Sequence, residues 1–438
     1  MSTEELYSIY QKCGGRVNTD SRTISGGELF VALKGENFDG NVFASKALEA
    51  GAAYALVSDD SQAAAEGGER IIAVPDTLEA LRSLALHHRL NCRADGSRFP
   101  VIGLTGTNGK TTTKELIKAV LSVKYNVSAT AGNLNNDIGV PQTLLKIRPE
   151  TEIAIVEMGA NHPDDISHLV EIVDPDYGLI TNVGKAHLLG FGSFEGVKRA
   201  KGQLYDYIAS HGGHAFVNVS DPVLASMAEE RNGLEAITYS PESFDAKVIP
   251  GTAENPFLSM MIGDISLQTK LVGAYNSANV LAAIVIGAHF GVSVADAADA
   301  IAAYEPSNNR SQMVRTERNT LIVDAYNANP SSMGVALANF AGIIAPHKLA
   351  LLGDMRELGP DSASEHEAIV RKVAGYGFDA VFVGEEFSKA VSSIGAGYKV
   401  FPDSASLAKA FHDSPVSGTT LLIKGSRSIM MEKVIPEL

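Results

Sequence analysis

The 438-residue chain has little cysteine, no excess of basic residues and no long apolar run. Its two cysteines, Cys13 and Cys92, are too few for a disulfide framework and indicate a reducing compartment. The formal net charge of −15 argues against nucleic acid or an anionic membrane as a partner, because an acidic surface attracts neither.

A membrane-spanning helix needs roughly 20 consecutive apolar residues, and no run approaches that length. The most apolar piece, residues 280–292, is interrupted by Gly287 and His289. The opening MSTEELYSIY lacks the basic and apolar segments of a secretory signal. We therefore expect a cytoplasmic protein that does not insert into membranes, and the chain length predicts two or three domains.

The most informative stretch is VIGLTGTNGKTTTKELIKAVL, residues 101–121. A short apolar strand runs into a glycine-rich turn, and Lys110 and Thr111 then open an amphipathic helix. This order is that of a phosphate-binding loop, in which backbone N–H groups and the helix N-terminus face a polyphosphate. Lys110 would reach the outer phosphates, and the Thr111 hydroxyl can hold Mg²⁺. The usual spacing would place a glycine at Leu104, so these residues alone leave a chance turn as the alternative.

The strand EIAIVEMG carries the second signal. Residues 153–156 form a continuous apolar run, which is typical of a parallel sheet covered on both faces. Glu157 follows at the carboxyl end of this strand, where ligands of open α/β sheets bind. Acidic residues at such places often only begin a loop, but beside a phosphate loop we favour a ligand of the triphosphate-bound Mg²⁺.

Other candidates have ordinary explanations when taken alone. TDSR (residues 19–22) and KGENFDG (34–40) are typical of turns. The asparagine-rich segment 130–141 is as typical of a loop without a function as of a loop that binds a ligand. A lone histidine such as His187 is more often structural than a ligand. Lys201 belongs to a lysine–arginine set of the kind that usually lies on a solvated helix face.

Two changes of pattern divide the chain into α/β domains at 1–98, 99–307 and 308–438. The polar NCRADGSRF marks a linker ending near Arg98, and Pro306 with the polar residues after it marks a boundary close to Ser307. In the last domain, polar clusters at 324–329, 354–357 and 424–427 each follow an apolar run. They should converge on one edge of a parallel sheet, the usual place for a small-ligand site.

Taken together, the motifs resemble the Mur ligase family over essentially the whole chain. The motifs that carry the resemblance are DSR, LFVALKGENFDG, GTNGKTTTKE, GNLNNDIGVPQTLL, EMGANHPDDI, NVGKAHLLGFGS, AKGQLYD, YNSANVLAA, VDAYNANPSSM, LLGDMRELG and IKGSRSIMME. The resemblance also accounts for the unusual glycine spacing. It implies an N-terminal UDP-binding domain, a central ATPase domain with a parallel sheet, and a C-terminal Rossmann-like domain that binds the amine acceptor.

The resemblance further implies an ADP-forming carbon–nitrogen ligase. ATP would phosphorylate the terminal carboxylate of UDP-MurNAc-tripeptide, and the amine of D-Ala-D-Ala would attack the acyl phosphate. The product would be UDP-MurNAc-pentapeptide, a peptidoglycan precursor. VDAYNANPSSM matches the members that add D-Ala-D-Ala rather than those that add a diamino acid. The expected cofactors are ATP and two Mg²⁺ ions, the partners are small molecules only, and the expected assembly is a monomer.

The resemblance also assigns roles to individual residues. The expected catalytic residues are Lys110, Glu157, His187 and Lys201, and the expected metal ligands are Thr111, Glu157, His187 and Lys201, for which the resemblance suggests carbamylation. The expected nucleotide contacts are Gly106, Thr107, Asn108, Gly109, Lys110, Thr111, Thr112, Asn276, Asn279, Arg310 and Asp324. The expected substrate contacts are Ser21, Arg22, Lys34, Phe38, Asp39 and Gly40 at the UDP end, Asn133, Asn135 and Asn136 on the UDP-sugar side, and Tyr326, Asn327 and Asn329 in the third domain.

Three positions depart from the commoner family pattern. Tyr275 and Asn41 stand where histidines are frequent, and Gln203 stands where a glutamate is frequent. The first departure could alter adenine stacking and the second the uracil pocket. None belongs to the expected phosphate or metal set.

Two alternative hypotheses for the function remain. The first is another amide ligase of the superfamily, acting on folate or adding a different amino acid, and the second is a regulatory nucleotide-binding ATPase. The DSR and FDG motifs favour a UDP-sugar substrate over folate. The guanine-reading Asn-Lys-x-Asp of a GTPase is not found. A protein that has lost catalysis is disfavoured, because every residue of the expected phosphate and metal set is present.

Overall fold

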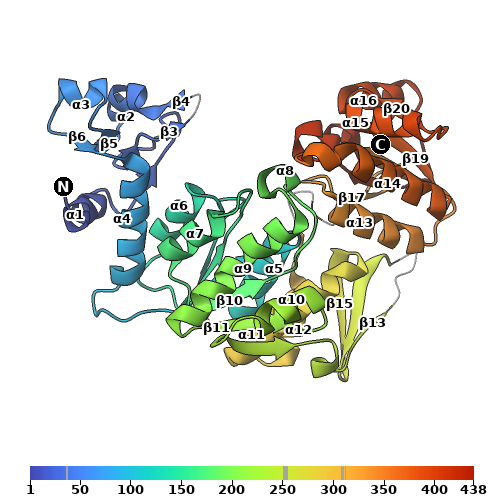
Figure 1. Ribbon diagram of the computed structural model, residues 1–438, viewed down its shortest axis with the longest axis horizontal. Coiled ribbons are helices and arrows are strands. Elements are labelled where there is room, and N and C mark those ends of the chain that lie inside the picture. The colour runs from blue at the N-terminus through green and yellow to red at the C-terminus, as the bar shows by residue number, and fades with distance from the viewer. Residues whose placement is uncertain (36–37, 250–254, 307–309, 311) are drawn as a thin grey trace.

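The computed structural model describes residues 1–35, 38–249, 255–306, 310 and 312–438. It forms three domains, with the N-terminal and C-terminal domains at opposite ends of the long axis and the central domain between and below them in the view of Figure 1. The expected boundary near Arg98 falls between helix α4 and strand β7, whereas the one at Ser307 lies outside the described residues. Within the described residues no helix is both long and apolar enough to cross a bilayer.

The first domain is built on a parallel sheet in the order β1-β2-β5-β6. Its strands are β1 Val17–Asn18, β2 Leu29–Val31, β5 Tyr54–Ser58 and β6 Ile71–Val74, and its helices are α1 Thr3–Lys12, α2 Ala44–Glu49, α3 Gln62–Glu66 and α4 Thr77–Asn91. A small antiparallel hairpin pairs β3 Lys34–Gly35 with β4 Phe38–Asp39. The Asp76 carboxylate accepts the first free N–H groups of α4 and so fixes where this helix begins.

The central domain has an all-parallel sheet in the order β12-β11-β10-β7-β9-β8. Its strands are β7 Val101–Thr105, β8 Val127–Ala129, β9 Ile153–Glu157, β10 Tyr177–Ile180, β11 His214–Asn218 and β12 Glu235–Tyr239. Its helices are α5 Lys110–Leu121, α6 Gly139–Leu145, α7 Asp165–Val173, α8 Leu188–Phe191, α9 Phe194–His211, α10 Pro222–Glu229, α11 Ser277–His289 and α12 Val294–Ala303. The continuous apolar runs of β7 and β9 are buried throughout, because helices cover both faces of the sheet.

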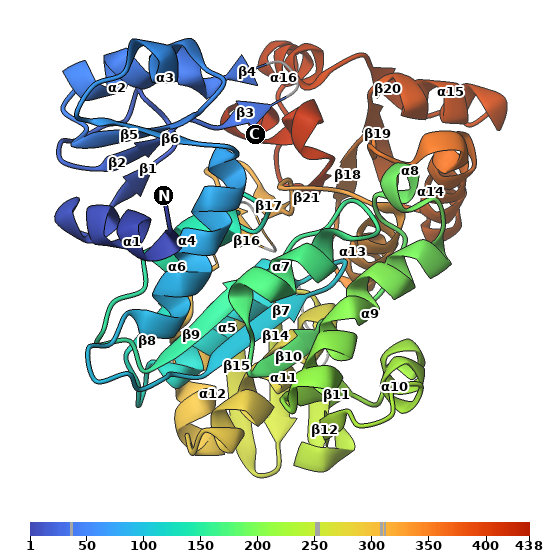
Figure 2. The same cartoon turned by 60° about the vertical axis from the view of Figure 1, so that its left-hand side comes forward.

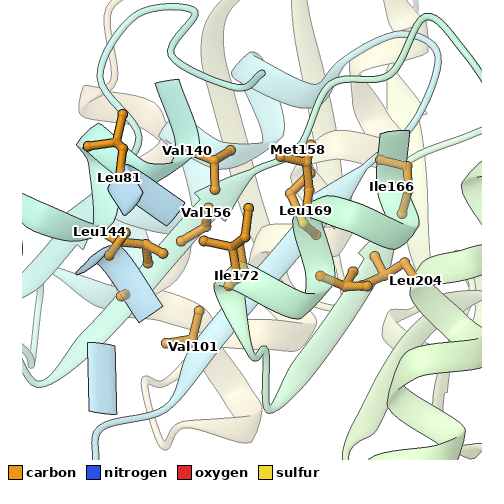
Figure 3. Packing of buried hydrophobic residues seen from close by; sticks show 14 of the residues in the cluster. Leu81, Val101, Val140, Leu144, Val156, Met158, Ile166, Leu169, Ile172 and Leu204 are labelled. Carbon is orange, nitrogen blue, oxygen red and sulfur yellow. The ribbon is translucent and has the colours of Figure 1, made fainter. Parts of the chain in front are cut away.

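One face of this sheet shares its core with the first domain. Leu81 of α4 and Leu144 of α6 belong to the same buried cluster as Val101 and Val156 of the sheet (Figure 3). Figure 2 shows α4 running beside α6. The opposite face packs on α5 and α11, and α12 packs in turn on these two helices.

An antiparallel sheet that the sequence analysis did not predict lies on the same side of the central sheet as α5, α11 and α12. Its strands are β13 Ala246–Ile249, β14 Phe257–Ile262 and β15 Ile265–Val272. Buried side chains of β14 and β15, including Leu258 and Leu267, belong to the same cluster as Ile301 of α12. This sheet thickens the central domain on the side away from the first domain.

The third domain has a sheet in the order β16-β17-β21-β18-β19-β20, in which only β16 is antiparallel. Its strands are β16 Gln312–Arg315, β17 Thr320–Val323, β18 Lys348–Gly353, β19 Asp379–Val383, β20 Lys399–Phe401 and β21 Thr420–Lys424. Its helices are α13 Pro330–Gly342, α14 Ser362–Tyr376, α15 Glu385–Ser393 and α16 Ser404–Asp413. Strands β17, β21 and β18 are neighbours, so the three predicted polar clusters follow adjacent strands at one edge, as expected.

Candidate active site

The phosphate-binding loop joins β7 to α5, and two of its glycines have backbone angles that only glycine adopts readily. Gly106 has φ 147° and Gly109 has φ 79°. A Cβ at Gly106 would lie 2.0 Å from Thr181 Oγ1, and one at Gly109 would lie 2.7 Å from Asn279 Oδ1. The three-residue glycine spacing therefore has a local cause: the loop passes too close to β10 and α11 for any side chain.

Lys110, the first residue of α5, folds back over this loop. Its Nζ donates to the carbonyls of Gly106 at 2.8 Å and Thr107 at 3.3 Å. Burial lowers the pKa of Lys110, the negative charge of Glu157 opposes that change, and the Arg310 guanidinium adds to it. The ammonium is thus held at the loop, where a polyphosphate would be cradled.

Glu157 ends β9 with its side chain 1% exposed, in contact with three other polar groups. Thr111 Oγ1 lies 3.0 and 3.2 Å from its two carboxylate oxygens, and Asn135 Nδ2 donates to Oε1 at 2.8 Å. The third group is Lys114, whose Nζ lies 3.8 Å from Oε2 and donates to the Thr130 carbonyl at 2.6 Å. Sequence analysis missed Lys114, although its place one helical turn after Lys110 puts both lysines on the same face of α5.

These groups suit a magnesium ion. Among the described residues no cluster of three or more His, Cys, Asp or Glu side chains forms a ready-made metal cage. The Thr111 hydroxyl and the Glu157 carboxylate are hard oxygen donors placed side by side at the phosphate loop. Mg²⁺ commonly takes one or two protein oxygens and completes its shell with substrate phosphates and water, so this donor set fits it.

His187 stands immediately before α8 with its ring at the domain junction. Its Nδ1 pairs with the carboxylate of Glu357 from the third domain. Burial lowers the pKa of His187, Glu357 opposes this, and the charges of Lys110 and Lys201 add to it. The histidine therefore lies within electrostatic reach of both predicted catalytic lysines.

Lys201 lies inside α9 and is 2% exposed. Burial holds the pKa of Lys201 well below its ordinary value, the Lys110 charge lowers it further, and Asp165 opposes both. Taken alone, the sequence suggested that Lys201 lies on a solvated helix face, and this interpretation is wrong. The family resemblance had already favoured a role in the site. Its side chain does not line the cavity described next, although its Nζ lies 5.8 Å from the centre of the Phe191 ring beside His187.

A cavity of about 1110 Å³ opens between the central and third domains. The predicted site residues that line it are Thr107, Asn108, Gly109, Lys110, Thr112, Asn133, Asn135, Asn136, Glu157, His187, Asn276, Asn279, Arg310, Asp324, Tyr326, Asn327 and Asn329. Residues far apart in the sequence therefore share one space. Their individual roles stay predictions.

The two asparagines at the start of α11 form a hydrogen-bonded chain. Thr113 Oγ1 donates to Asn279 Oδ1 at 3.0 Å, Asn279 Nδ2 donates to Asn276 Oδ1 at 2.9 Å, and Asn276 Nδ2 donates to the Val272 carbonyl at 3.0 Å. This chain ties α11 to α5, directly behind the phosphate loop. Tyr275, the first departure from the family pattern, also lines the cavity.

The third domain contributes a face rich in cations and amides. Lys424 Nζ donates to Asp324 at 2.6 Å, and Asn329 Nδ2 reaches across the domain boundary to Asn108 at 2.9 Å. Tyr326 has the Arg310 guanidinium 3.6 Å from its ring centre. Arg427, which sequence analysis did not assign, lies 5.3 Å from the same ring centre and donates to the tyrosine hydroxyl at 3.2 Å.

Several predicted residues lie elsewhere. The expected UDP-end contacts, which do not line the cavity, are Ser21, Arg22, Lys34, Phe38, Asp39 and Gly40. Arg22 instead pairs with Asp20 at 2.7 Å. A Cβ at Gly40 would lie 2.5 Å from the Leu33 carbonyl oxygen, so the FDG turn requires glycine here.

Asp354 corrects the expectation for the cluster at 354–357. It is fully buried, and its carboxylate accepts the N–H groups of Glu386 at 3.1 Å and Phe387 at 2.9 Å. The side chain thus caps α15 inside the third domain and does not face the site. The same cluster nevertheless supplies Arg356 and Glu357 to the cavity, neither of which sequence analysis had singled out.

The other two departures from the family pattern make local hydrogen bonds. Asn41 accepts from the Ser58 N–H at 2.9 Å, and Gln203 accepts from the Ser167 N–H at 3.0 Å. Neither side chain lines the cavity.

Three family models match consecutive parts of the chain. They are the Mur ligase family, catalytic domain, at residues 16–89, the Mur ligase middle domain at 104–287, and the Mur ligase, glutamate ligase domain, at 309–427. A curated relative, the UDP-N-acetylmuramoyl-tripeptide–D-alanyl-D-alanine ligase of Bacillus subtilis (strain 168), is 32% identical over 432 residues, which cover 96% of this chain and 92% of the relative. The chain belongs to the Mur ligase family. The ligase of the same name from Escherichia coli (strain K12) is 33% identical, with coverage of 96% and 93%.

Solved structures agree with this assignment. A crystal structure of MurF from Acinetobacter baumannii superposes with a TM-score of 0.85 at 31% identity, covering 97% of this chain and 93% of that one. MurF ligase from Thermotoga maritima, in complex with ADP, gives a TM-score of 0.81 at 25% identity, with 96% coverage of both chains. The predicted family and three-domain α/β architecture are confirmed.

Proposed function

We propose that this Mur ligase joins D-Ala-D-Ala to UDP-MurNAc-tripeptide, with conversion of ATP to ADP and phosphate. One observation carries the proposal: the phosphate loop of the central domain and the polar strand ends of the third domain face a single cavity. Such a cavity can hold a nucleotide, an activated carboxylate and an amine together. The named activity of relatives that are 32% and 33% identical over nearly the whole chain supports this choice of substrates.

The donor side of the reaction centres on the phosphate loop. Lys110 and the N-terminus of α5 would bind the outer phosphates of ATP, and Thr111 with Glu157 would hold Mg²⁺. The bound ion would neutralise charge on the phosphates as the tripeptide carboxylate approaches. Lys110 and Arg310 would offset the remaining negative charge, because both cations face the same cavity.

Lys201 would complete a second Mg²⁺ site with His187. Burial favours the neutral amine of Lys201, and only a neutral amine adds CO₂. Addition of CO₂ forms a carbamate carboxylate and releases one proton. This reaction would convert the buried neutral amine into an anion that a metal ion can pair with.

The chemistry then needs two transfers. The tripeptide carboxylate oxygen attacks the γ-phosphorus, the bond to the β-phosphate oxygen breaks, and ADP leaves. The neutral amine of D-Ala-D-Ala next attacks the acyl phosphate, an amide forms, inorganic phosphate leaves, and the amine loses a proton. Phosphorylation is required because a carboxylate is a poor acyl donor.

Arg427 is our candidate for the residue that recognises the carboxylate of D-Ala-D-Ala. Within the described part of the chain Arg427 has no acidic partner, whereas its neighbour Lys424 is already paired with Asp324. Tyr326 orients the guanidinium through its hydroxyl and its ring. A guanidinium held in this way is suited to a carboxylate, which it can bind through two N–H groups.

The first domain would hold the UDP end of the donor substrate. The loop containing Asn133, Asn135 and Asn136 lines the cavity and would contact the sugar side of the donor. Since the expected UDP contacts lie outside this cavity, the long donor substrate would span from one domain to the other. We further propose that the protein acts in the cytoplasm as a monomer.

The test is phosphate release from ATP with UDP-MurNAc-tripeptide, in the presence and absence of D-Ala-D-Ala. Full turnover should require both substrates, and release that ignored both would defeat the ligase proposal. Lys110→Ala should abolish turnover while leaving the circular dichroism spectrum and melting temperature close to those of the parent. Retained turnover would mean that the ATP site is misplaced.

A further inference from the structure

The contact between His187 and Glu357 joins a predicted metal ligand to the third domain. Nδ1 of His187 pairs with the Glu357 carboxylate. The backbone carbonyl of Glu357 also accepts the N–H of Leu189, at 3.1 Å. Glu357 is therefore fixed to the segment around α8 at two points, one through its side chain and one through its backbone.

Both residues of this contact have unusual backbone conformations. His187 has φ 51° and Glu357 has φ 62°, in the left-handed region that side chains with a Cβ disfavour. Among the described residues, only Asp174, Asp245 and Met430 share this feature outside glycine. Two of the five strained positions thus face each other across a domain boundary, and strain of this kind tends to collect at functional sites.

The geometry also selects which nitrogen of His187 is free. Because Nδ1 is turned to the carboxylate of Glu357, Nε2 is the nitrogen left to act as a ligand. A carboxylate partner of this kind fixes the tautomer and the ring orientation of a metal-binding histidine. The carboxylate comes from the third domain, so its effect depends on that domain being docked.

We propose that Glu357 is a positioning residue, which holds the His187 imidazole with Nε2 free to bind the second metal ion only when the third domain is docked. The domain that supplies the acceptor site would thereby also complete the metal site. Metal-dependent phosphate chemistry would then be coupled to the presence of the acceptor domain. This inference rests on the proposed ligase function.

The same interface contains a matched control. Lys185 Nζ pairs with Glu365 at 2.6 Å, and the Lys185 N–H donates to Ser331 Oγ at 3.0 Å. Both contacts dock the third domain beside His187 without touching its ring. Glu365→Ala therefore removes one contact between the domains and leaves Glu357 in place beside His187, whereas Glu357→Ala releases the imidazole.

The first experiment reads the tautomer of His187 directly, without metal or nucleotide. Histidine ¹⁵N spectra would be recorded for the parent, Glu357→Ala, Glu357→Gln and Glu365→Ala, with His187→Gln assigning the signal. We expect a single Nδ1–H tautomer in the parent, its retention in Glu357→Gln and Glu365→Ala, and a mixed tautomer in Glu357→Ala. A parent without the Nδ1–H tautomer, or equal changes in both alanine variants, would overturn the proposal.

The second experiment measures the Mg²⁺ dependence of turnover. Loss of a residue that orients a metal ligand typically costs about 10–100-fold in metal affinity. We expect the half-saturating Mg²⁺ concentration to rise by that factor in Glu357→Ala, with the KM for D-Ala-D-Ala unchanged, and to stay near the parent value in Glu365→Ala. An unchanged Mg²⁺ requirement in Glu357→Ala would contradict the proposal. Absence of D-Ala-D-Ala-dependent turnover in the parent would instead defeat the proposed function. The ¹⁵N spectra would still test whether Glu357 fixes the tautomer of His187.

Discussion

Replacement of Lys201 by methionine should stabilise the protein while destroying its activity. Lys201 is almost fully buried, and burial together with the Lys110 charge holds its pKa well below the ordinary 10.5. Methionine has a similar length and carries no charge, so it removes the cost of burying an ammonium. Activity should be lost, because methionine cannot form a carbamate.

The magnitude follows from proton linkage. Between the lowered pKa of folded Lys201 and the ordinary value of 10.5, the unfolded chain binds one more proton than the folded chain. The free energy of unfolding of the parent therefore rises with pH across this window, by up to about 1.4 kcal/mol per pH unit. From pH 8.0 to 9.5, the stability advantage of Lys201→Met should shrink by up to about 2 kcal/mol.

The assay is urea unfolding in CO₂-free buffer, followed by circular dichroism, with hydrogen exchange of α9 reporting on the central domain. Every other titrating group is common to both proteins, so the difference between the two pH curves isolates Lys201. Parallel curves would refute the claim that the buried amine has a lowered pKa. Retained turnover in Lys201→Met would separately exclude its role as a metal ligand.

Three further substitutions test the site. Gly109→Ala should lower the free energy of unfolding by on the order of 1–3 kcal/mol and raise the KM for ATP, because the new methyl group meets Asn279 and φ is positive. The control is Gly263→Ala, which introduces a methyl group at a positive φ in open space and so tests backbone strain alone. Glu157→Gln should raise the Mg²⁺ requirement by about tenfold or more without unfolding the protein, as metal titration and melting would reveal. Arg427→Ala should raise the KM for D-Ala-D-Ala by about 10–100-fold and abolish the preference over D-alanyl-D-alaninamide; a variant that still discriminates between them would exclude Arg427.

The sequence predicted best where chemistry and local structure share the same residues. In the phosphate loop, the glycines, Lys110 and Thr111 are contiguous, and the close approach of Thr181 and Asn279 explains their spacing. The position of Glu157 at the end of β9 was equally predictable, because a continuous apolar run, typical of a buried strand, ends there in a carboxylate.

The direction in which side chains point beyond a strand end could not be predicted from the sequence. Asp354 and Glu357 are three positions apart in one polar cluster, yet the first caps α15 in the core and the second reaches His187. Glu357 has a left-handed backbone conformation, and no periodicity in the sequence predicts it. The burial of Lys201 is similar, since it depends on how α9 packs against the rest of the domain.

The antiparallel sheet was missed for a different reason. The burial of β15 alternates along Ile265–Val272, and Gly263 sits in the tight turn before it. Those signals were present in the sequence, but the sequence analysis assigned no strand to residues 246–272. The position of the UDP-end residues relative to the cavity, by contrast, depends on the angle between domains, which no local pattern encodes.

Isotope transfer tests the central claim most directly. UDP-MurNAc-tripeptide labelled with ¹⁸O in its terminal carboxylate would be incubated with ATP, Mg²⁺ and D-Ala-D-Ala, and the products analysed by mass spectrometry. Passage through an acyl phosphate predicts one labelled oxygen in the inorganic phosphate for each UDP-MurNAc-pentapeptide formed. Unlabelled phosphate, or phosphate released without pentapeptide, would contradict the account.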